Sequence, residues 1–365
     1  MKITFPHFGN TYIPVKILFD GLGLEYVIPP LNNNEALEMG TLHSPEEICL
    51  PFKIMMGNYI QSIKEGADTI VLIGSNGPCR FGEYCELQKN ILRNLGYDLE
   101  FIVLESPNVI GKEEFKKRVY KISEQSPKNK TEKWKALGNT LLALRLIEEI
   151  ERKALYKCGY EANRGEHKYI LNQCKREVMR TNDPHQALNI LKQYHRKIDK
   201  IPLDTIKKPI TVALMGEIYT IIEPFSNLYI QDKLMDFGVS IKKGLSLDGW
   251  LIDAFLRSFK LNSIAIRKAS KEYLPYDIGG HGRECVGEAL IANKEKLDGG
   301  IQLFPMGCMP EIVSKVILQS ISKNKDFPIM TLVMDEMTGE AGFVTRIEAF
   351  FDLLERRREY VLFGS

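Results

Sequence analysis

This 365-residue chain contains seven cysteines, whose thiol groups can bind metals or act as nucleophiles. Three of them share a local setting, because each follows a predicted strand or opens a predicted helix: Cys49, Cys79 and Cys308. A helix N-terminus carries a partial positive charge and unpaired N–H groups, so it favours thiolate over thiol. Thiolate is the form that binds iron or zinc. The shared setting therefore predicts metal ligands, the alternative being that each is a small buried hydrophobe.

Cys-x-Pro occurs at two of these three positions, each time before an amphipathic stretch. Pro51 and Pro310 then fall in the first helical turn, where the missing N–H of proline costs nothing. The flanking glycines would let the backbone approach a bulky inorganic cluster. These glycines are Gly77, Gly82 and Gly307. Ligands so far apart in the chain would have to converge through the fold.

The other four cysteines divide by context. Cys85 is predicted on the helix after Cys79, where it could face the same site or the core. Cys285 opens a helix after a glycine-rich loop and could be a further ligand. Cys158 and Cys174 lie in a helical segment and are predicted to be structural. The odd number of cysteines and the lack of Cys-x-x-Cys disfavour disulfide scaffolds and zinc ribbons.

Other candidate groups have simpler alternatives. His281, inside the loop Gly279-Gly280-His281-Gly282, could be a ligand or proton donor, or it could anchor its loop. The acids of residues 335–340 could line a cleft or start the last helix. The charge runs 207–208 and 356–358 are predicted to be solvated faces. Glycine-rich nucleotide-binding patterns are absent from the sequence.

The elements that must position these residues fall into three regions. Residues 1–110 alternate short β-branched runs with helical stretches, which predicts a parallel sheet covered on both faces. Residues 111–205 are rich in Lys, Arg and Glu and carry helical periodicity, which predicts a helical insertion. Residues 206–365 alternate again. The predicted fold is therefore α/β, with two doubly wound parallel-sheet domains separated by a helical insertion.

Each of the two α/β regions contains several predicted strands and helices. The strands are 3–5, 26–28, 69–73, 101–104, 209–215, 300–304 and 328–334. The helices are 52–64, 84–95, 230–237, 247–259, 284–294, 311–322 and 342–358. In the insertion, helices are predicted at 133–157, 168–181 and 183–198.

Composition excludes several classes of protein. Hydrophobic residues make up 44% and charged residues 26%, which is ordinary for a folded globular chain. Lys and Arg number 49 against 47 Asp and Glu, so nucleic acid is not expected as the main partner. Signal peptides and membrane spans are not predicted, and a cytoplasmic location without a membrane partner is expected. Thiols stay reduced there.

Several motifs together resemble a known family. They are Cys49-Leu50-Pro51-Phe52-Lys53, Gly77-Pro78-Cys79-Arg80-Phe81-Gly82, Gly216-Glu217, Glu223-Pro224-Phe225-Ser226-Asn227, Pro275-Tyr276, Gly279-Gly280-His281, Cys308-Met309-Pro310-Glu311, Asp335-Glu336, Thr338-Gly339-Glu340 and Thr345-Arg346-Ile347-Glu348-Ala349-Phe350. In this order they resemble the activase-related branch of the 2-hydroxyacyl-CoA dehydratase family. The resemblance covers both α/β regions but not the helical insertion.

The resemblance implies an iron–sulfur protein of anaerobic metabolism. Dehydratases of this family hold a [4Fe-4S] cluster through three cysteines, and relatives hold an [8Fe-9S] double cubane. The matching cysteines here are Cys49, Cys79 and Cys308, with Cys85 and Cys285 as further candidates. An ATP-dependent iron–sulfur activase would supply a low-potential electron for a reductive or dehydration reaction.

Substrate and assembly stay open at this point. The substrate would be a small molecule or an acyl-CoA, and a homodimer is one alternative for the assembly. A non-catalytic electron relay or scaffold for an activase is the second hypothesis. A zinc-bound or metal-free α/β binding protein is the third.

Overall fold

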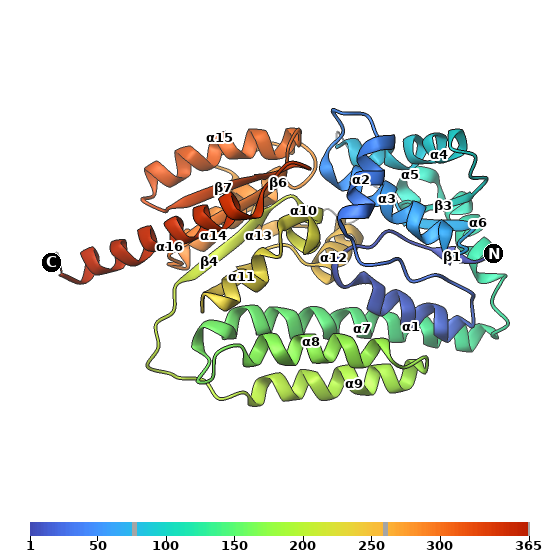
Figure 1. Ribbon diagram of the computed structural model, residues 1–365, viewed down its shortest axis with the longest axis horizontal. Helices are drawn as coiled ribbons and strands as arrows, with labels where there is room; N and C mark the ends of the chain where they lie inside the picture. The colour runs from blue at the N-terminus through green and yellow to red at the C-terminus, as the bar shows by residue number, and fades with distance from the viewer. Residues whose placement is uncertain (75–78, 258–261, 364–365) are drawn as a thin grey trace. The chain divides into compact units, whose positions relative to one another are not determined.

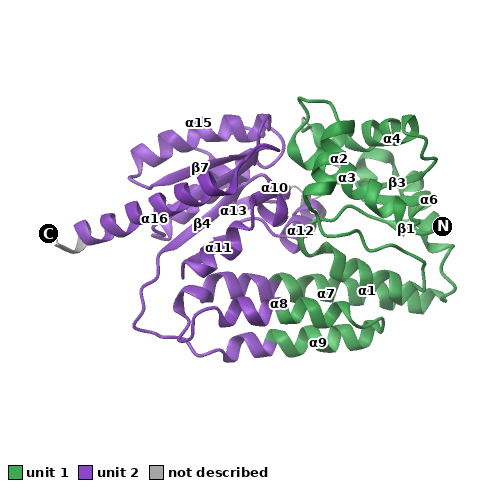
Figure 2. Cartoon of the chain, viewed as in Figure 1, with its two compact units in different colours: residues 1–148, 173–195 green, residues 149–172, 196–365 purple. Residues whose placement is uncertain are grey.

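A computed structural model describes residues 1–74, 79–257 and 262–363 of the chain (Figure 1). The chain divides into two compact units, coloured separately in Figure 2. Unit 1 comprises residues 1–148 and 173–195, and unit 2 comprises residues 149–172 and 196–365. Within the described residues, unit 1 holds a parallel sheet of three strands and unit 2 one of four. A long helical region lies between the two sheets in the sequence, so the protein is α/β as predicted.

Unit 1 alternates strands and helices over its first 123 residues. Its strands are β1 (Ile3–Thr4), β2 (Thr69–Ile73) and β3 (Glu100–Leu104). Its α-helices are α1 (Tyr12–Leu22), α2 (Asn34–His43), α3 (Leu50–Lys64), α4 (Tyr84–Asn94), α5 (Pro107–Ile110) and α6 (Lys112–Ser123). Two 3-10 turns, η1 (Gly9–Thr11) and η2 (Arg80–Glu83), precede α1 and α4.

The sheet of unit 1 has the order β1-β2-β3, and all of its pairs are parallel. A single parallel bridge joins Ile3 to Tyr26 on the outer side of β1. The predicted strand at residues 26–28 is thus reduced to one bridge. If that bridge is counted as a strand position, the chain enters the sheet at its second position and then occupies the first, third and fourth. This is a doubly wound order.

Helices α2 and α3 pack against each other through two glycines. A Cβ atom on Gly57 would lie 1.7 Å from the carbonyl oxygen of Ala36, and one on Gly40 would lie 1.7 Å from that of Lys53. Only hydrogen fits at these positions, so the two backbones come into direct contact. Almost all of α3 is buried as a result, including Phe52 at 0% exposure. This packing holds the N-terminus of α3 in place.

Unit 2 carries the second sheet. Its strands are β4 (Thr211–Gly216), β5 (Ser240–Lys243), β6 (Gly299–Pro305) and β7 (Ile329–Met334). Its α-helices after residue 206 are α10 (Ile218–Ile222), α11 (Ile230–Asp236), α12 (Leu247–Arg257), α13 (Ile264–Ser270), α14 (Gly282–Lys294), α15 (Met309–Asn324) and α16 (Glu340–Phe363). A 3-10 turn, η5 (Phe225–Asn227), follows α10. The end predicted for α12, residues 258–259, lies outside the described residues.

The sheet of unit 2 has the order β5-β4-β6-β7, with every pair parallel. The chain leaves β4 for β5 on one side and returns to β6 on the other. The point between β4 and β6 is therefore a topological switch point, where α/β sheets form ligand crevices at their carboxyl ends. Both sheets thus follow the same spatial order, as the sequence pattern predicted.

Helices cover both faces of the second sheet. On one face Met215 packs with Ala289 of α14 and Leu318 of α15 in a buried core cluster. Elsewhere in unit 2, Gly299 at the start of β6 lies close to Phe350 and Leu354 of α16. A Cβ atom on Gly299 would approach the Phe350 ring to 3.0 Å, so the glycine lets α16 come close to the strand.

The helical region consists of three long helices and two 3-10 turns. They are α7 (Lys130–Lys157), η3 (Cys158–Tyr160), α8 (Glu166–Met179), α9 (Pro184–Lys197) and η4 (Ile198–Lys200). The three α-helices match the predicted ranges within three residues. Across the described part of the chain, none of the helices combines the length and the apolar composition that a membrane span requires.

Candidate functional site

The structure places the three leading cysteines at helix starts, as the sequence predicted. Cys49 is the N-cap of α3, Cys79 is the N-cap of η2, and Cys308 is the N-cap of α15. All three have extended backbones and are partly exposed. Proline occupies the first turn of both α3 and α15. Each sulfur is thus attached where the first helical N–H groups favour a negative charge.

Within unit 1, the start of α3 packs against the segment that contains Cys79. Arg80 Nη1 donates a hydrogen bond to the Glu47 carbonyl oxygen at 3.0 Å. The hydroxyl of Tyr84 contacts Cys49 Sγ, and its ring meets the Phe52 ring edge-on at 5.0 Å. The structure therefore brings together the two segments that carry Cys49 and Cys79. Gly77 and Pro78 of the second motif lie outside the described residues.

In unit 2, Cys308 follows β6 beside the topological switch point. Gly307, with φ of 79°, makes the turn, and the Cys308 N–H donates to the Pro305 carbonyl at 3.1 Å. The end of β4 is tied to β6, because the Glu217 N–H donates to the Leu303 carbonyl at 2.9 Å. Gly216 permits this close approach. Cys308 thus occupies the edge of the sheet where this topology places ligands.

The glycine-rich loop around His281 packs on the first turn of α15. Ser314 Oγ donates to the Gly282 carbonyl at 3.0 Å, and a Cβ atom on Gly280 would lie 2.9 Å from Pro310 Cγ. His281 itself is the N-cap of α14. The loop therefore lies beside the helix start that carries Cys308, which keeps His281 a candidate for the site.

Cys285 lies in a buried polar cluster inside unit 2. Its side chain is 0% exposed and lies close to the carboxyl of Glu311. Gln302 Nε2 donates to Glu311 Oε2 at 2.9 Å, and Thr331 Oγ1 donates to Gln302 Oε1 at 3.1 Å. Burial raises the pKa of the Cys285 thiol well above its usual value, with the nearby carboxyls of Glu311 and Glu288 adding to the effect. The neutral thiol is therefore the favoured form.

Glu311 is a residue of this cluster whose pKa lies near neutral pH. It is fully buried in the first turn of α15, and desolvation raises its pKa to about 7. Glu284 and Glu288 of α14 also have raised pKa values, with desolvation as the largest cause for both. Burial therefore shifts all three carboxyls toward the protonated form, and it brings the pKa of Glu311 close to neutral pH. Such groups can store and release a proton within the core of unit 2.

Three further cysteines have environments that disfavour thiolate. Desolvation, followed by the Glu86 carboxylate, raises the pKa of Cys85 on α4. Burial raises the pKa values of Cys158 and Cys174 to about 12. Cys158 Sγ donates to the Leu155 and Val239 carbonyls at 3.1 Å each, as a buried structural thiol does.

The acidic motif after β7 starts a helix. The Asp335 Oδ1 atom accepts hydrogen bonds from the Met337 N–H at 3.0 Å and from Thr338 Oγ1 at 2.7 Å, which closes a turn. Glu340 is the first residue of α16 and pairs with Lys233 at 2.8 Å. Of the two alternatives for this motif, the structure supports the helix start.

Sequence reasoning did not find Glu311, Gln302 or Tyr84 as parts of these sites. Glu311 stands three residues after Cys308, a spacing that is also ordinary for a helix start. Gln302 lies inside an apolar strand, and a polar residue in such a strand is a usable signal of a buried hydrogen-bond partner. Tyr84 carries no signal of its own.

Each of the three N-cap cysteines has a side chain whose thiolate form can bind a metal. Among residues 1–74, 79–257 and 262–363, no three His, Cys, Asp or Glu side chains are grouped closely enough to hold a metal ion. The local settings are thus present, while the convergence of three sulfurs stays a prediction.

Comparisons with known proteins do not assign this chain to a class, so its class is defined by its fold and site. No model of a known protein family matches the chain, and no curated protein matches it either. Fold and site define an α/β protein in which cysteines begin helices at or near the carboxyl ends of two parallel sheets.

Proposed function

We propose that this protein is a cytoplasmic iron–sulfur protein similar to 2-hydroxyacyl-CoA dehydratase subunits. It accepts low-potential electrons from an ATP-dependent activase for a reductive or dehydration reaction on a small molecule or an acyl-CoA. Cys49, Cys79 and Cys308 are the ligands of a [4Fe-4S] cluster. When bound, such a cluster supplies one-electron transfer and a Lewis-acidic iron.

One observation carries the proposal. Two helix starts of unit 1, which bear Cys49 and Cys79, pack directly against each other through Tyr84 and Arg80. A third helix start follows β6 in unit 2 and shares the Cys-x-Pro sequence of Cys49. Helix N-termini stabilise thiolates, and thiolates are the ligands that iron–sulfur clusters require. Cys85 and Cys285 are left out of the ligand set because their surroundings favour the neutral thiol.

The chain's own residues also provide a proton store near one ligand. Glu311 stands one turn after Cys308, and its pKa of about 7 lets it hold or release a proton at neutral pH. Gln302 holds the carboxyl by a hydrogen bond, and the buried Cys285 lies close to it. A reduction consumes protons, and a dehydration needs an acid that protonates the leaving hydroxyl group. A buried acid of this pKa is suited to such general acid catalysis.

A protein partner is supported by the exposed face of α15. Apolar side chains spaced three and four residues apart follow Cys308 along this helix. They are Met309, Ile312, Val313 and Val316, with exposed fractions of 45%, 47%, 38% and 62%. An apolar stripe of this kind on a surface helix is typical of a docking face for another protein. We assign this face to the activase.

The same docking face would serve a non-catalytic electron relay, which is the second candidate function. The relay would accept electrons in the same way and pass them to another enzyme. Net turnover by the isolated pair of proteins separates the two functions.

Anaerobic reconstitution with iron and sulfide, followed by reduction with an activase and ATP, tests the proposal. Electron paramagnetic resonance should show a reduced cluster in the wild type and in Cys174→Ala, which alters a buried thiol of the helical region. Cys308→Ser should lose the native signal. An unchanged signal in Cys308→Ser would overturn the ligand assignment, and reduction without turnover of any acyl-CoA or hydroxy acid would favour the relay.

A further inference from the structure

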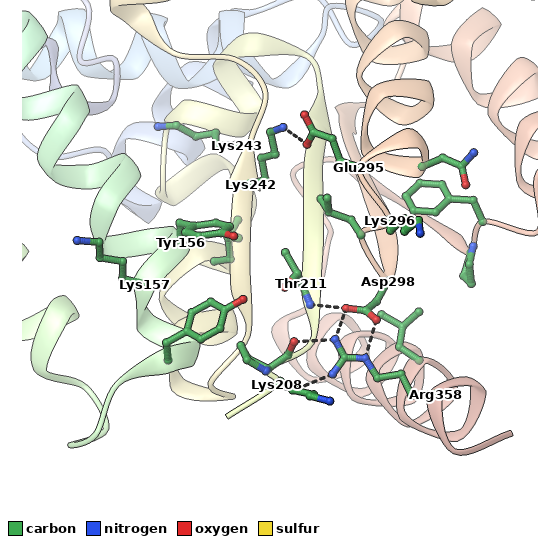
Figure 3. Close-up of a pocket in the computed structure, with 18 of the residues that line it drawn as sticks. Tyr156, Lys157, Lys208, Thr211, Lys242, Lys243, Glu295, Lys296, Asp298 and Arg358 are labelled. Atoms are coloured by element: carbon green, nitrogen blue, oxygen red, sulfur yellow. Dashed lines mark hydrogen bonds and ion pairs between the residues drawn. The ribbon is translucent and has the colours of Figure 1, made fainter. Parts of the chain in front are cut away.

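A large basic groove lies wholly within unit 2, at the opposite end of the second sheet from Cys308. It has a volume of about 1450 Å³ and is lined at the amino ends of β4, β6 and β7 and along the edge strand β5. Figure 3 shows Tyr156, at the end of α7, beside the strand that carries Lys242. Lys208 precedes β4 and Asp298 precedes β6, so the groove is separate from the carboxyl-end site.

Positive charge exceeds negative charge in this groove. Among its described lining residues, ten are cationic: Arg152, Lys153, Lys157, Lys207, Lys208, Lys242, Lys243, Lys296, Arg357 and Arg358. Six carboxylates pair with these cations: Asp248, Asp199, Glu295, Glu151, Asp326 and Asp298. Ten minus six leaves an excess of four positive charges. A concave surface with such an excess attracts anions.

The excess is concentrated on exposed lysines. In the part of the chain that the structure describes, Lys208 and Lys296 take part in none of the recorded ion pairs, and both are solvent-exposed. Lys207 Nζ donates to the Glu161 carbonyl at 2.6 Å, which leaves its charge without a carboxylate. Figure 3 shows Lys208 and Lys296 from different segments of the groove wall. These side chains can reach an anion without breaking a recorded salt bridge.

Two tyrosines give the groove an aromatic wall. Tyr156 at the end of α7 is 46% exposed, and its ring centroid lies 6.0 Å from that of Tyr160. An exposed ring beside cationic side chains is a platform on which a nucleobase can stack. We propose that this groove binds a small oligophosphate that carries an aromatic base, the class to which nucleoside triphosphates belong.

The surrounding backbone sets how the phosphates are held. Helices α7 and α14 both end at the groove, and a helix C-terminus presents carbonyl groups rather than N–H donors. Phosphates must therefore be held by lysine and arginine side chains, and binding depends strongly on ionic strength. The groove has a volume of about 1450 Å³, and the chain as a whole has a net charge of only +2, which favours a small ligand over a nucleic acid.

Isothermal titration of the full chain tests the proposal with three probes at low salt: tripolyphosphate, ATP without magnesium, and adenosine. We expect tripolyphosphate and ATP to bind and adenosine not to bind at about 1 mM. Stacking on Tyr156 should make ATP bind at least about fivefold more tightly than tripolyphosphate, and Tyr156→Ala should remove that difference. The double variant Lys208→Glu/Lys296→Glu should weaken binding of both by about tenfold or more.

A matched charge reversal away from the groove is the control. Lys268→Glu/Lys271→Glu changes the net charge equally in unit 2 and should alter both dissociation constants by less than about twofold. Equal losses in the two double variants, or no binding of either phosphate compound, would overturn the site. Equal affinity for ATP and tripolyphosphate would overturn the aromatic part of the proposal. Tighter binding of a single-stranded oligonucleotide than of ATP would overturn the small ligand.

Discussion

Glu311 allows a sharp test of the buried cluster in unit 2. Its carboxyl is fully buried, Gln302 donates to it at 2.9 Å, and desolvation raises its pKa from the ordinary 4.5 to about 7. Folding therefore favours the protonated acid. The stability that Glu311 contributes is complete below the unfolded-state pKa and is lost as the pH rises through about 7.

The magnitude follows from the separation of the two pKa values. The folded-state pKa lies about 2.5 above the unfolded-state pKa. At about 1.4 kcal/mol per pKa unit, this difference corresponds to about 3.5 kcal/mol in the free energy of unfolding. Glu311→Gln keeps a neutral amide in place of the acid and removes the titration. We expect this variant to match the wild type near pH 4.5 and to be more stable by up to about 3.5 kcal/mol at pH 8.

Urea unfolding followed by circular dichroism across this pH range measures the difference. Glu348→Gln, which changes an exposed carboxyl on α16, is the control and should follow the wild type at every pH. A Glu311→Gln variant that is less stable than the wild type at pH 8 would refute the reasoning. That result would mean that the fold stabilises the carboxylate rather than the acid.

Three further predictions concern packing, a buried charge and the docking face. Gly216→Ala should lower the free energy of unfolding by about 3 kcal/mol in thermal melts. Its Cβ would lie 1.9 Å from a carbonyl oxygen of β6, and its backbone φ is 133°. Gly339→Ala, whose Cβ would face open space, is the control and should leave the free energy of unfolding nearly unchanged. Lys243→Met should cost about 3–5 kcal/mol by removing the cation that pairs with the buried Glu151 carboxylate. Adding Glu151→Met should recover most of that loss, and an unrecovered double variant would contradict the account. Ile312→Glu should slow activase-dependent reduction about tenfold at unchanged melting temperature, and an unchanged rate would remove α15 as the docking face.

Buried strands and proline-marked helix starts were the features that sequence could predict. Strand β2 spans the predicted residues 69–73, because a short β-branched run between turn residues has few alternatives. Pro51 and Pro310 marked the starts of α3 and α15, since proline is tolerated only in the first turn of a helix. The same signals placed Cys49 and Cys308 at N-caps.

Elements with weak patterns could not be predicted. Strand β5 (Ser240–Lys243) is an edge strand that ends in two lysines, so it has no continuous apolar run. Helix α2 (Asn34–His43) was missed because its apolar periodicity is weak, and its clearest signal is the Asn33 cap, which accepts from the Ala36 N–H at 2.9 Å.

The basic groove shows a different limit of sequence reasoning. The runs 207–208 and 356–358 were predicted to be solvated faces, and Lys207, Lys208 and Arg356 are exposed. The sequence did not predict that Lys208 and Arg358 line one groove together with residues from α7 and β5. Charge runs of ordinary length give no information about which other segments the fold brings beside them. The buried cluster around Glu311 could not be predicted for the same reason, because Gln302 and Cys285 come from other elements of the fold.

The iron content of anaerobically reconstituted protein is the most direct test of the central claim. The account predicts about four irons per chain in the wild type and in Cys174→Ala, and a loss of iron in each of Cys49→Ser, Cys79→Ser and Cys308→Ser. A wild-type protein that takes up no iron, or three serine variants that all keep the full complement, would contradict it.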